Sequence, residues 1–134
     1  LSAMSQTIGG ILDALTICMF DGWAYSLPDL VAALNSVTGL GYDLGAVLRT
    51  GESLWSLKRS IACLLGATAA DDRLPKRLLT PLPDGPTAGT ALDLDTMLKE
   101  FYTLRHLDAQ GRPSRAHLES LGLADVAQIL HGRA

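Results

Sequence analysis

Apolar residues recur at helical spacing along most of the 134-residue chain. In the first such block, residues 8–20, one stripe is formed by Ile8, Ile11, Leu12, Leu15 and Met19. Residues three and four positions apart share one face of a helix, so this block predicts a helix. Asp13 and Ile17 lie on the opposite face. The helix is therefore apolar almost all the way round, and such helices are usually buried on both faces.

Two further helices are predicted between residues 27 and 65. Leu27-Pro28-Asp29 opens the shorter one, with proline at its first position, where the missing N–H does no harm. Its apolar face consists of Leu30, Val31, Leu34 and Val37. Asp43 is the predicted N-cap of the longest helix, whose apolar face extends over about six turns as far as Leu65.

The last third of the chain predicts three shorter helices. Asp93 or Asp95 caps the first, which has an apolar face of Leu94, Met97, Leu98 and Phe101. A turn at residues 108–113 precedes a helix capped by Ser114, and the apolar residues within 123–130 predict a final helix.

Residues 66–92 lose the helical periodicity and hold four of the six prolines. A loop of this length is uncommon inside a compact domain and usually serves a function or packs against something outside it. We therefore expect residues 1–134 to form a single helical domain of the all-α class. Its expected architecture is an irregular bundle of about five to six helices with one long Pro/Gly-rich loop at 66–92.

Polar positions within the longest helix carry two further expectations. Gly51 lies in mid-helix, where glycine costs about 1 kcal/mol relative to alanine, so we expect a second helix to cross closely there. Glu52, Lys58 and Arg59 lie off the apolar stripe and predict a solvated or interdomain face. Cys63, near the helix end, is interpreted as a core residue.

Composition and charge restrict the class of protein. With 48% hydrophobic and 19% charged residues, the chain is expected to be globular rather than disordered. A net charge of -3 without a basic run argues against nucleic acid or an anionic membrane as partner. Asp13, Asp21 and Asp29 interrupt the apolar runs, so no transmembrane span is expected. No secretion signal is recognisable, and a cytoplasmic location is expected.

Few residues are available for chemistry. Cys18 and Cys63 are the two cysteines, and neither belongs to a Cys-x-x-Cys pair, so a complete zinc or iron-sulfur site requires ligands from another segment. The three histidines lack the spacing of a helical metal site and are interpreted as surface residues: His106, His117 and His131. Phosphate-binding loops and the GxSxG and HExxH motifs are absent.

Asp13 and Cys18 leave two interpretations open. In one, Asp13 caps a helix or faces solvent, and Cys18 is an inert core residue. In the other, Asp13 accepts hydrogen bonds from a polar cofactor and Cys18 is a thiolate metal ligand. On a continuous helix the two side chains are about 140° apart, so they face one ligand only if the helix ends before the cysteine. Gly22 is the residue expected to provide that end.

Several segments follow one another in an order that is typical of one family. They are residues 71–77, 81–86, 94–98, 101–105, 111–114 and 121–126. Together they resemble the C-terminal part of the tungsten-containing aldehyde ferredoxin oxidoreductase family. The resemblance runs over essentially the whole chain and implies an all-α, C-terminal domain of a larger enzyme.

The family's D-x-x-G-L-C motif resembles residues 13–18. By that resemblance, Asp13 hydrogen-bonds the pterin of a tungstopterin cofactor, and Ile17 contacts the same pterin through its backbone. Cys18 is then one of four cysteines that hold a 4Fe-4S cluster. Thr16 and Ile17 stand where the motif has Gly and Leu. The family's Asn-x-Arg-Glu stretch has no counterpart at 63–68, so no residue role is transferred there.

The resemblance implies an oxidoreductase that converts aldehydes to carboxylic acids, or reduces a related carbonyl or acyl substrate. The implied cofactors are a tungsten or molybdenum bis-pterin and a 4Fe-4S cluster shared with residues outside this chain. The implied partners are the missing N-terminal and middle domains and ferredoxin or a related electron carrier. The isolated chain is expected to be inactive and to self-associate through its apolar first helix. The alternative is a cofactor-free helical scaffold or protein-interaction module.

Overall fold

The computed structural model describes residues 1–132, in which all regular elements are helical and none is a strand. The elements are α1 (Ser2–Ala14), α2 (Met19–Gly22), α3 (Leu27–Thr38), α4 (Leu44–Leu64), the 3-10 turn η1 (Ala69–Asp71), α5 (Lys76–Leu79), α6 (Leu94–Leu104), α7 (Arg115–Ser120) and α8 (Ala124–His131). The predicted all-α class is thereby confirmed. No helix within residues 1–132 has both the length and the apolarity to cross a bilayer.

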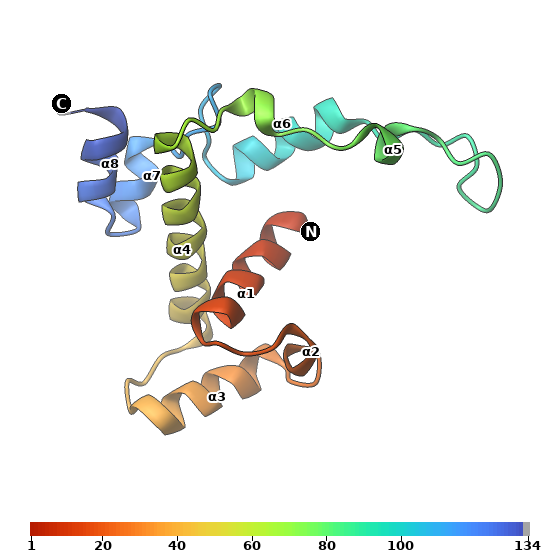
Figure 1. Cartoon of the computed structure of the whole chain (residues 1–134). Coiled ribbons are helices and arrows are strands. Elements are labelled where there is room, and N and C mark those ends of the chain that lie inside the picture. Colours follow the sequence, from red (N-terminus) through yellow and green to blue (C-terminus); the bar gives the residue numbers. More distant parts are fainter. Residues whose placement is uncertain (133–134) are drawn as a thin grey trace.

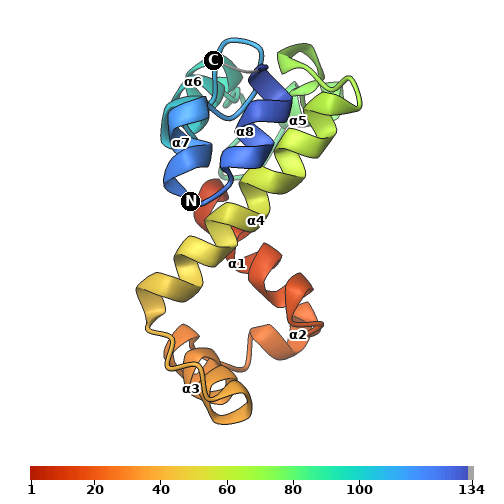
Figure 2. The same ribbon diagram turned by 90° about the vertical axis from the view of Figure 1, so that its left-hand side faces the viewer.

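The 21-residue helix α4 is the longest helix among residues 1–132 and packs against α1, α3 and α8. Figure 1 shows α1 crossing α4, with α2 beyond the end of α1, α3 near the start of α4, and α7 and α8 beside its second half. Figure 2, at right angles, separates the same two groups at opposite ends of α4. The region around α1 and α4 therefore links every other part of the fold.

The apolar core lies where α1 crosses α4 and meets α3. Its buried side chains are Ile11, Leu12, Leu30 and Val47. A Cβ atom built on Gly51 would lie 2.8 Å from carbon atoms of both Ile11 and Thr7. The close helix crossing expected at Gly51 is confirmed, because only a residue without a side chain permits it.

Most of the predicted helix starts are correct. Asp43, Asp93 and Ser114 each accept a hydrogen bond from the backbone N–H three residues later, which satisfies one free donor of the following helix. The start of α3 differs from expectation, since Ser26 is the N-cap and forms a reciprocal capping box with Asp29. The proline that follows therefore occupies the second helical position.

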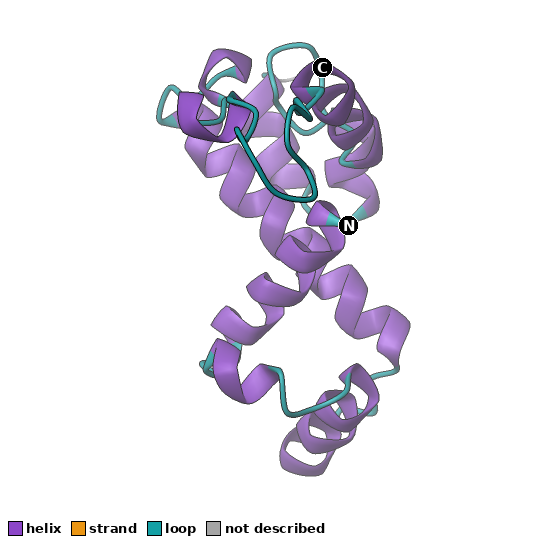
Figure 3. Ribbon diagram, turned by 90° about the vertical axis from the view of Figure 1, so that its right-hand side faces the viewer, coloured by secondary structure: helices purple, strands orange, loops and turns teal. Residues whose placement is uncertain are grey.

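The segment from 66 to 92 is largely irregular, as predicted, but it contains η1 and α5. Figure 3 shows it as a long teal stretch interrupted by short helical turns. Its side chains from Pro75 to Asp93 are exposed. Its first part is fixed to α4, because the Arg59 guanidinium donates to both carboxylate oxygens of Asp72 at 2.7 and 2.6 Å. Arg59 was expected on a solvated or interdomain face; it is partly buried and pairs within the domain instead.

Candidate functional site

The chain turns sharply between Asp13 and Cys18 because α1 ends at Ala14. Thr16 has a left-handed backbone, with φ of 56°. Its N–H donates to the Asp13 carbonyl at 3.1 Å, and the Ile17 N–H donates to the Leu12 carbonyl at 2.9 Å. This is the Schellman arrangement of a helix C-terminus. The prediction of one helix through residue 20 was wrong, and Thr16 rather than Gly22 provides the end.

Thr16 is an unusual residue for this conformation. A left-handed backbone costs a residue with a side chain roughly 1–2 kcal/mol, and β-branched residues tolerate it poorly. Glycine adopts it freely. Thr16 stands at the glycine position of the D-x-x-G-L-C motif that residues 13–18 resemble. The left-handed backbone required at this position explains why the motif has glycine there.

Asp13 lies on the solvent side of this turn. Its carboxylate forms an ion pair of 3.3 Å with the Lys58 ammonium, and the two side chains are 70% and 62% exposed, respectively. Such an exposed pair contributes little free energy. The carboxylate of Asp13 is consequently free to exchange Lys58 for another hydrogen-bond donor.

Ile17 joins the turn to the core. Its side chain packs against the core cluster, and its N–H is already donated to Leu12. Among residues 1–132, no backbone or side-chain donor bonds to the carbonyl oxygen of Ile17. A ligand that contacts this backbone must therefore supply a donor to that oxygen.

Cys18 is exposed, immediately before the short helix α2. The interpretation of Cys18 as a core residue is thus wrong. Gly22 sets the distance between α2 and α1, since a Cβ atom there would lie 2.7 Å from Leu12 Cδ1. Asp13, Ile17 and Cys18 consequently belong to one short connection, and Leu12 contacts both Ile17 within it and Gly22 just after it.

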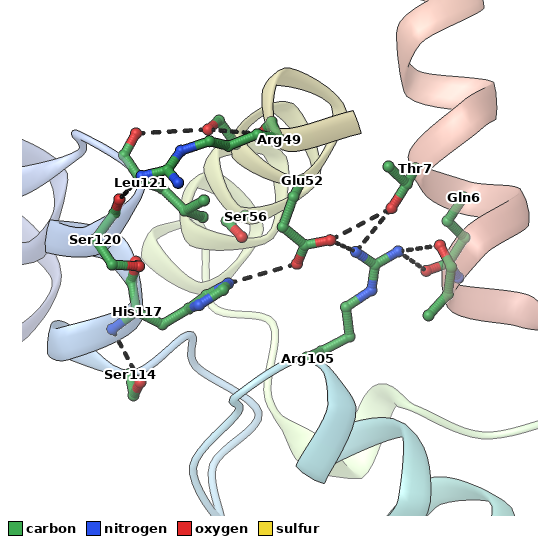
Figure 4. A network of polar contacts seen from close by, with 12 residues as sticks. Gln6, Thr7, Arg49, Glu52, Ser56, Arg105, Ser114, His117, Ser120 and Leu121 are labelled. Atoms are coloured by element: carbon green, nitrogen blue, oxygen red, sulfur yellow. Dashed lines mark hydrogen bonds and ion pairs between the residues drawn. The ribbon is translucent and has the colours of Figure 1, made fainter. Parts of the chain in front are cut away.

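A buried polar network holds α1 against the rest of the fold (Figure 4). Arg105, 1% exposed, donates to the carboxylate of Glu52, to the Thr7 hydroxyl and to the Ala3 carbonyl. Burial lowers the pKa of Arg105, and the carboxylate of Glu52 opposes that shift. Glu52 was expected on a solvated or interdomain face; it pairs within the domain instead, with Arg105, the residue that caps the end of α6, 53 positions later.

His117 extends the network on the other side of Glu52. Its Nε2 lies 3.4 Å from Glu52 Oε1, with the His117 side chain 12% exposed. Burial lowers the pKa of His117, as does the neighbouring His106, whose ring centroid is 4.4 Å away. The prediction of a surface position holds for His106 but was wrong for His117.

Metal ligands are few in this structure. Within residues 1–132, no three His, Cys, Asp or Glu side chains come together as a metal-binding group. Cys63 lies near the end of α4, where its Sγ is 3.6 Å from the Gly111 carbonyl oxygen, and burial raises the pKa of its thiol. The two cysteines therefore belong to different parts of the fold.

Comparison with known proteins gives consistent matches over this chain. The sequence model of "Aldehyde ferredoxin oxidoreductase, domains 2 & 3" matches residues 1–123. The tungsten-containing aldehyde ferredoxin oxidoreductase of Thermococcus kodakarensis is 33% identical over 122 residues, which cover 90% of this chain and 20% of that protein. The protein of the same name from Pyrococcus furiosus is 32% identical over the same shares. The chain thus spans about a fifth of the length of these relatives.

Proposed function

Because the chain belongs to the aldehyde ferredoxin oxidoreductase family, we propose that residues 13–18 form one wall of a tungstopterin and 4Fe-4S site in a larger oxidoreductase. The observation that supports this most strongly is the left-handed Thr16 at the motif's glycine position. It ends α1 between Asp13 and Cys18, and both of these residues are exposed.

The donor set of the turn fits the two groups. A pterin is rich in N–H donors, and the turn offers the exposed carboxylate of Asp13 and the free carbonyl oxygen of Ile17. A cluster iron requires a thiolate, and Cys18 is accessible for that role. Asp13 and Ile17 are thus assigned to bind and orient the pterin, and Cys18 to hold one corner of the cluster.

The tungsten or molybdenum bis-pterin, when bound, supplies the oxidation of an aldehyde to a carboxylic acid or the reduction of a related carbonyl or acyl group. This chain contributes by holding Asp13, Ile17 and Cys18 in position for the cofactors. The Schellman turn fixes the backbone between Asp13 and Cys18. Leu12 accepts the hydrogen bond from the Ile17 N–H and also contacts Gly22 of α2. Ferredoxin or a related carrier is the proposed electron partner of the whole enzyme.

The remaining ligands must come from other domains of the same polypeptide. Cys63 is partly buried against the Gly111 carbonyl oxygen, so Cys18 is the exposed thiol that this chain offers to a cluster. We therefore propose that the chain alone is inactive, and that the remaining four-fifths of the enzyme complete the site.

The experiment is removal of one thiol at a time from the full-length protein. Cys18→Ser should lose cluster iron and the associated visible absorbance, because serine is a poor ligand for cluster iron. Cys63→Ser is the matched control and should retain both. Iron and absorbance unchanged in Cys18→Ser would instead favour the alternative function, a cofactor-free helical scaffold or interaction module.

A further inference from the structure

The short helix α2 and the turn that follows it carry a group of exposed large side chains directly after Cys18. They are Met19, Phe20, Trp23 and Tyr25, which are 57%, 73%, 74% and 62% exposed, respectively. We call these four residues the α2 patch. Isolated exposed apolar residues are common on protein surfaces, but a contiguous group of this kind marks an interaction site.

The four side chains of the patch are each more than half exposed, although Gly22, in the same short segment, lies against Leu12 of α1. Phe20 and Trp23 contact each other edge to face, with ring centroids 5.2 Å apart. Figures 1 and 2 both show α2 at the outer edge of the group formed with α1 and α3. The α2 patch is therefore available to a partner.

Two observations indicate what covers the patch. The relatives are about five times as long as this chain, so most of such a polypeptide lies outside the structure. Cys18 is the N-cap of α2, so any segment that brings further thiolates to a cluster on Cys18 must come close to α2. The same approach brings that segment over the neighbouring aromatic side chains.

We propose that the α2 patch docks on the segment of the longer polypeptide that carries the remaining cluster thiolates, and that this contact shields Cys18 from water. The proposal rests on the proposed function for the identity of that segment. Asp21, exposed within the patch, has no ion-pair partner among residues 1–132. The surface of the partner segment that covers the patch is therefore expected to be apolar, with a Lys or Arg side chain opposite Asp21.

The test is hydroxyl-radical footprinting of the full-length protein, because Met, Phe, Trp and Tyr side chains all react with this probe. We expect labelling of the patch residues to be several-fold lower in the native protein than in urea, and equally low after dilution. Labelling as high as in urea would overturn the proposal. Protection that disappears on dilution would also overturn it, since it would identify a second copy as the partner.

Variants separate this proposal from the proposed function. Trp23→Lys should raise labelling at Tyr25 and release iron, whereas Val37→Lys, at an 87% exposed site on α3, should change neither. Asp21→Lys should also raise labelling, with Asp84→Lys on the long loop as its control.

Exposure of the patch with full retention of iron would show that the docked segment does not carry the cluster thiolates. In a Cys18→Ser protein, retained iron contradicts the proposed function, while a protected patch still supports docking.

Discussion

The guanidinium of Arg105 lies over the indole ring of Trp55, 4.2 Å from the ring centroid, while it also pairs with the carboxylate of Glu52. The same guanidinium donates to Ala3 and Thr7 of α1. One cation thus joins α1, α4 and the end of α6, and the position of the turn at residues 13–18 depends on it through α1.

Arg105→Met should loosen α1. It removes the cation but leaves the partly buried carboxylate of Glu52, and breaking such a pair costs about 3–5 kcal/mol. Hydrogen–deuterium exchange of the α1 amides in the full-length protein measures the effect. Arg112→Met is the control, since its pair with Asp108 is more exposed and should change the exchange by less than about 1 kcal/mol. Equal exchange in the two variants would contradict the role assigned to Arg105.

Thr16→Gly should stabilise the protein by about 1 kcal/mol, because glycine accepts the left-handed backbone without strain. The reverse change at an equivalent helix end, Gly66→Thr, should destabilise it, since Gly66 has φ of 101°. The urea midpoint of each variant gives the comparison. A destabilised Thr16→Gly protein would mean that the threonine side chain makes a contact that outweighs the backbone strain.

Gly51→Ala should destabilise the crossing of α1 and α4 by about 1–3 kcal/mol, because the added carbon would lie 2.8 Å from Ile11 and Thr7. Gly9→Ala offers a matched control in α1, where nothing lies within 4 Å of the new carbon. There the better helix propensity of alanine should stabilise by about 0.5–1 kcal/mol. Thermal unfolding of both variants checks the opposite signs, and equal signs would contradict the close crossing.

Stability should fall as the pH drops below about 6.5, the ordinary pKa of histidine. Burial lowers the pKa of folded His117, so the unfolded chain binds the proton more readily and is favoured as the pH falls. Above that range the contribution of His117 is fully present. His106→Asn should weaken the effect, because His106 adds to the lowering of the His117 pKa, and asparagine tolerates the left-handed backbone at this position. Urea unfolding between pH 5 and 8 provides the measurement, and identical profiles would contradict this account.

The parts of the fold that were predictable are those governed by local chemistry. Asp43, Asp93 and Ser114 cap helices through bonds to residues three positions away, and such caps are visible in sequence. Gly51 was informative because a mid-helix glycine has a cost that only packing explains. The end of α1 was missed because threonine gives no local signal for a left-handed backbone.

Long-range pairing was not predictable from single positions. Glu52 and Arg105 are 53 residues apart, and Arg59 pairs with Asp72 across the turn that follows α4. Each charged residue has the sequence signature of a solvated surface, and only the fold supplies its partner. Asp13 and Cys18 were proposed as site residues through the family motif, and the structure shows that each is exposed.

Anaerobic purification of the full-length native polypeptide, with its intact mass and its tungsten, molybdenum and iron content determined together, tests the central claim most directly. We predict a mass several times that of this chain, with about four irons and one tungsten or molybdenum per polypeptide. A protein of the same length free of iron and of both heavier metals would contradict the role proposed for Asp13, Ile17 and Cys18.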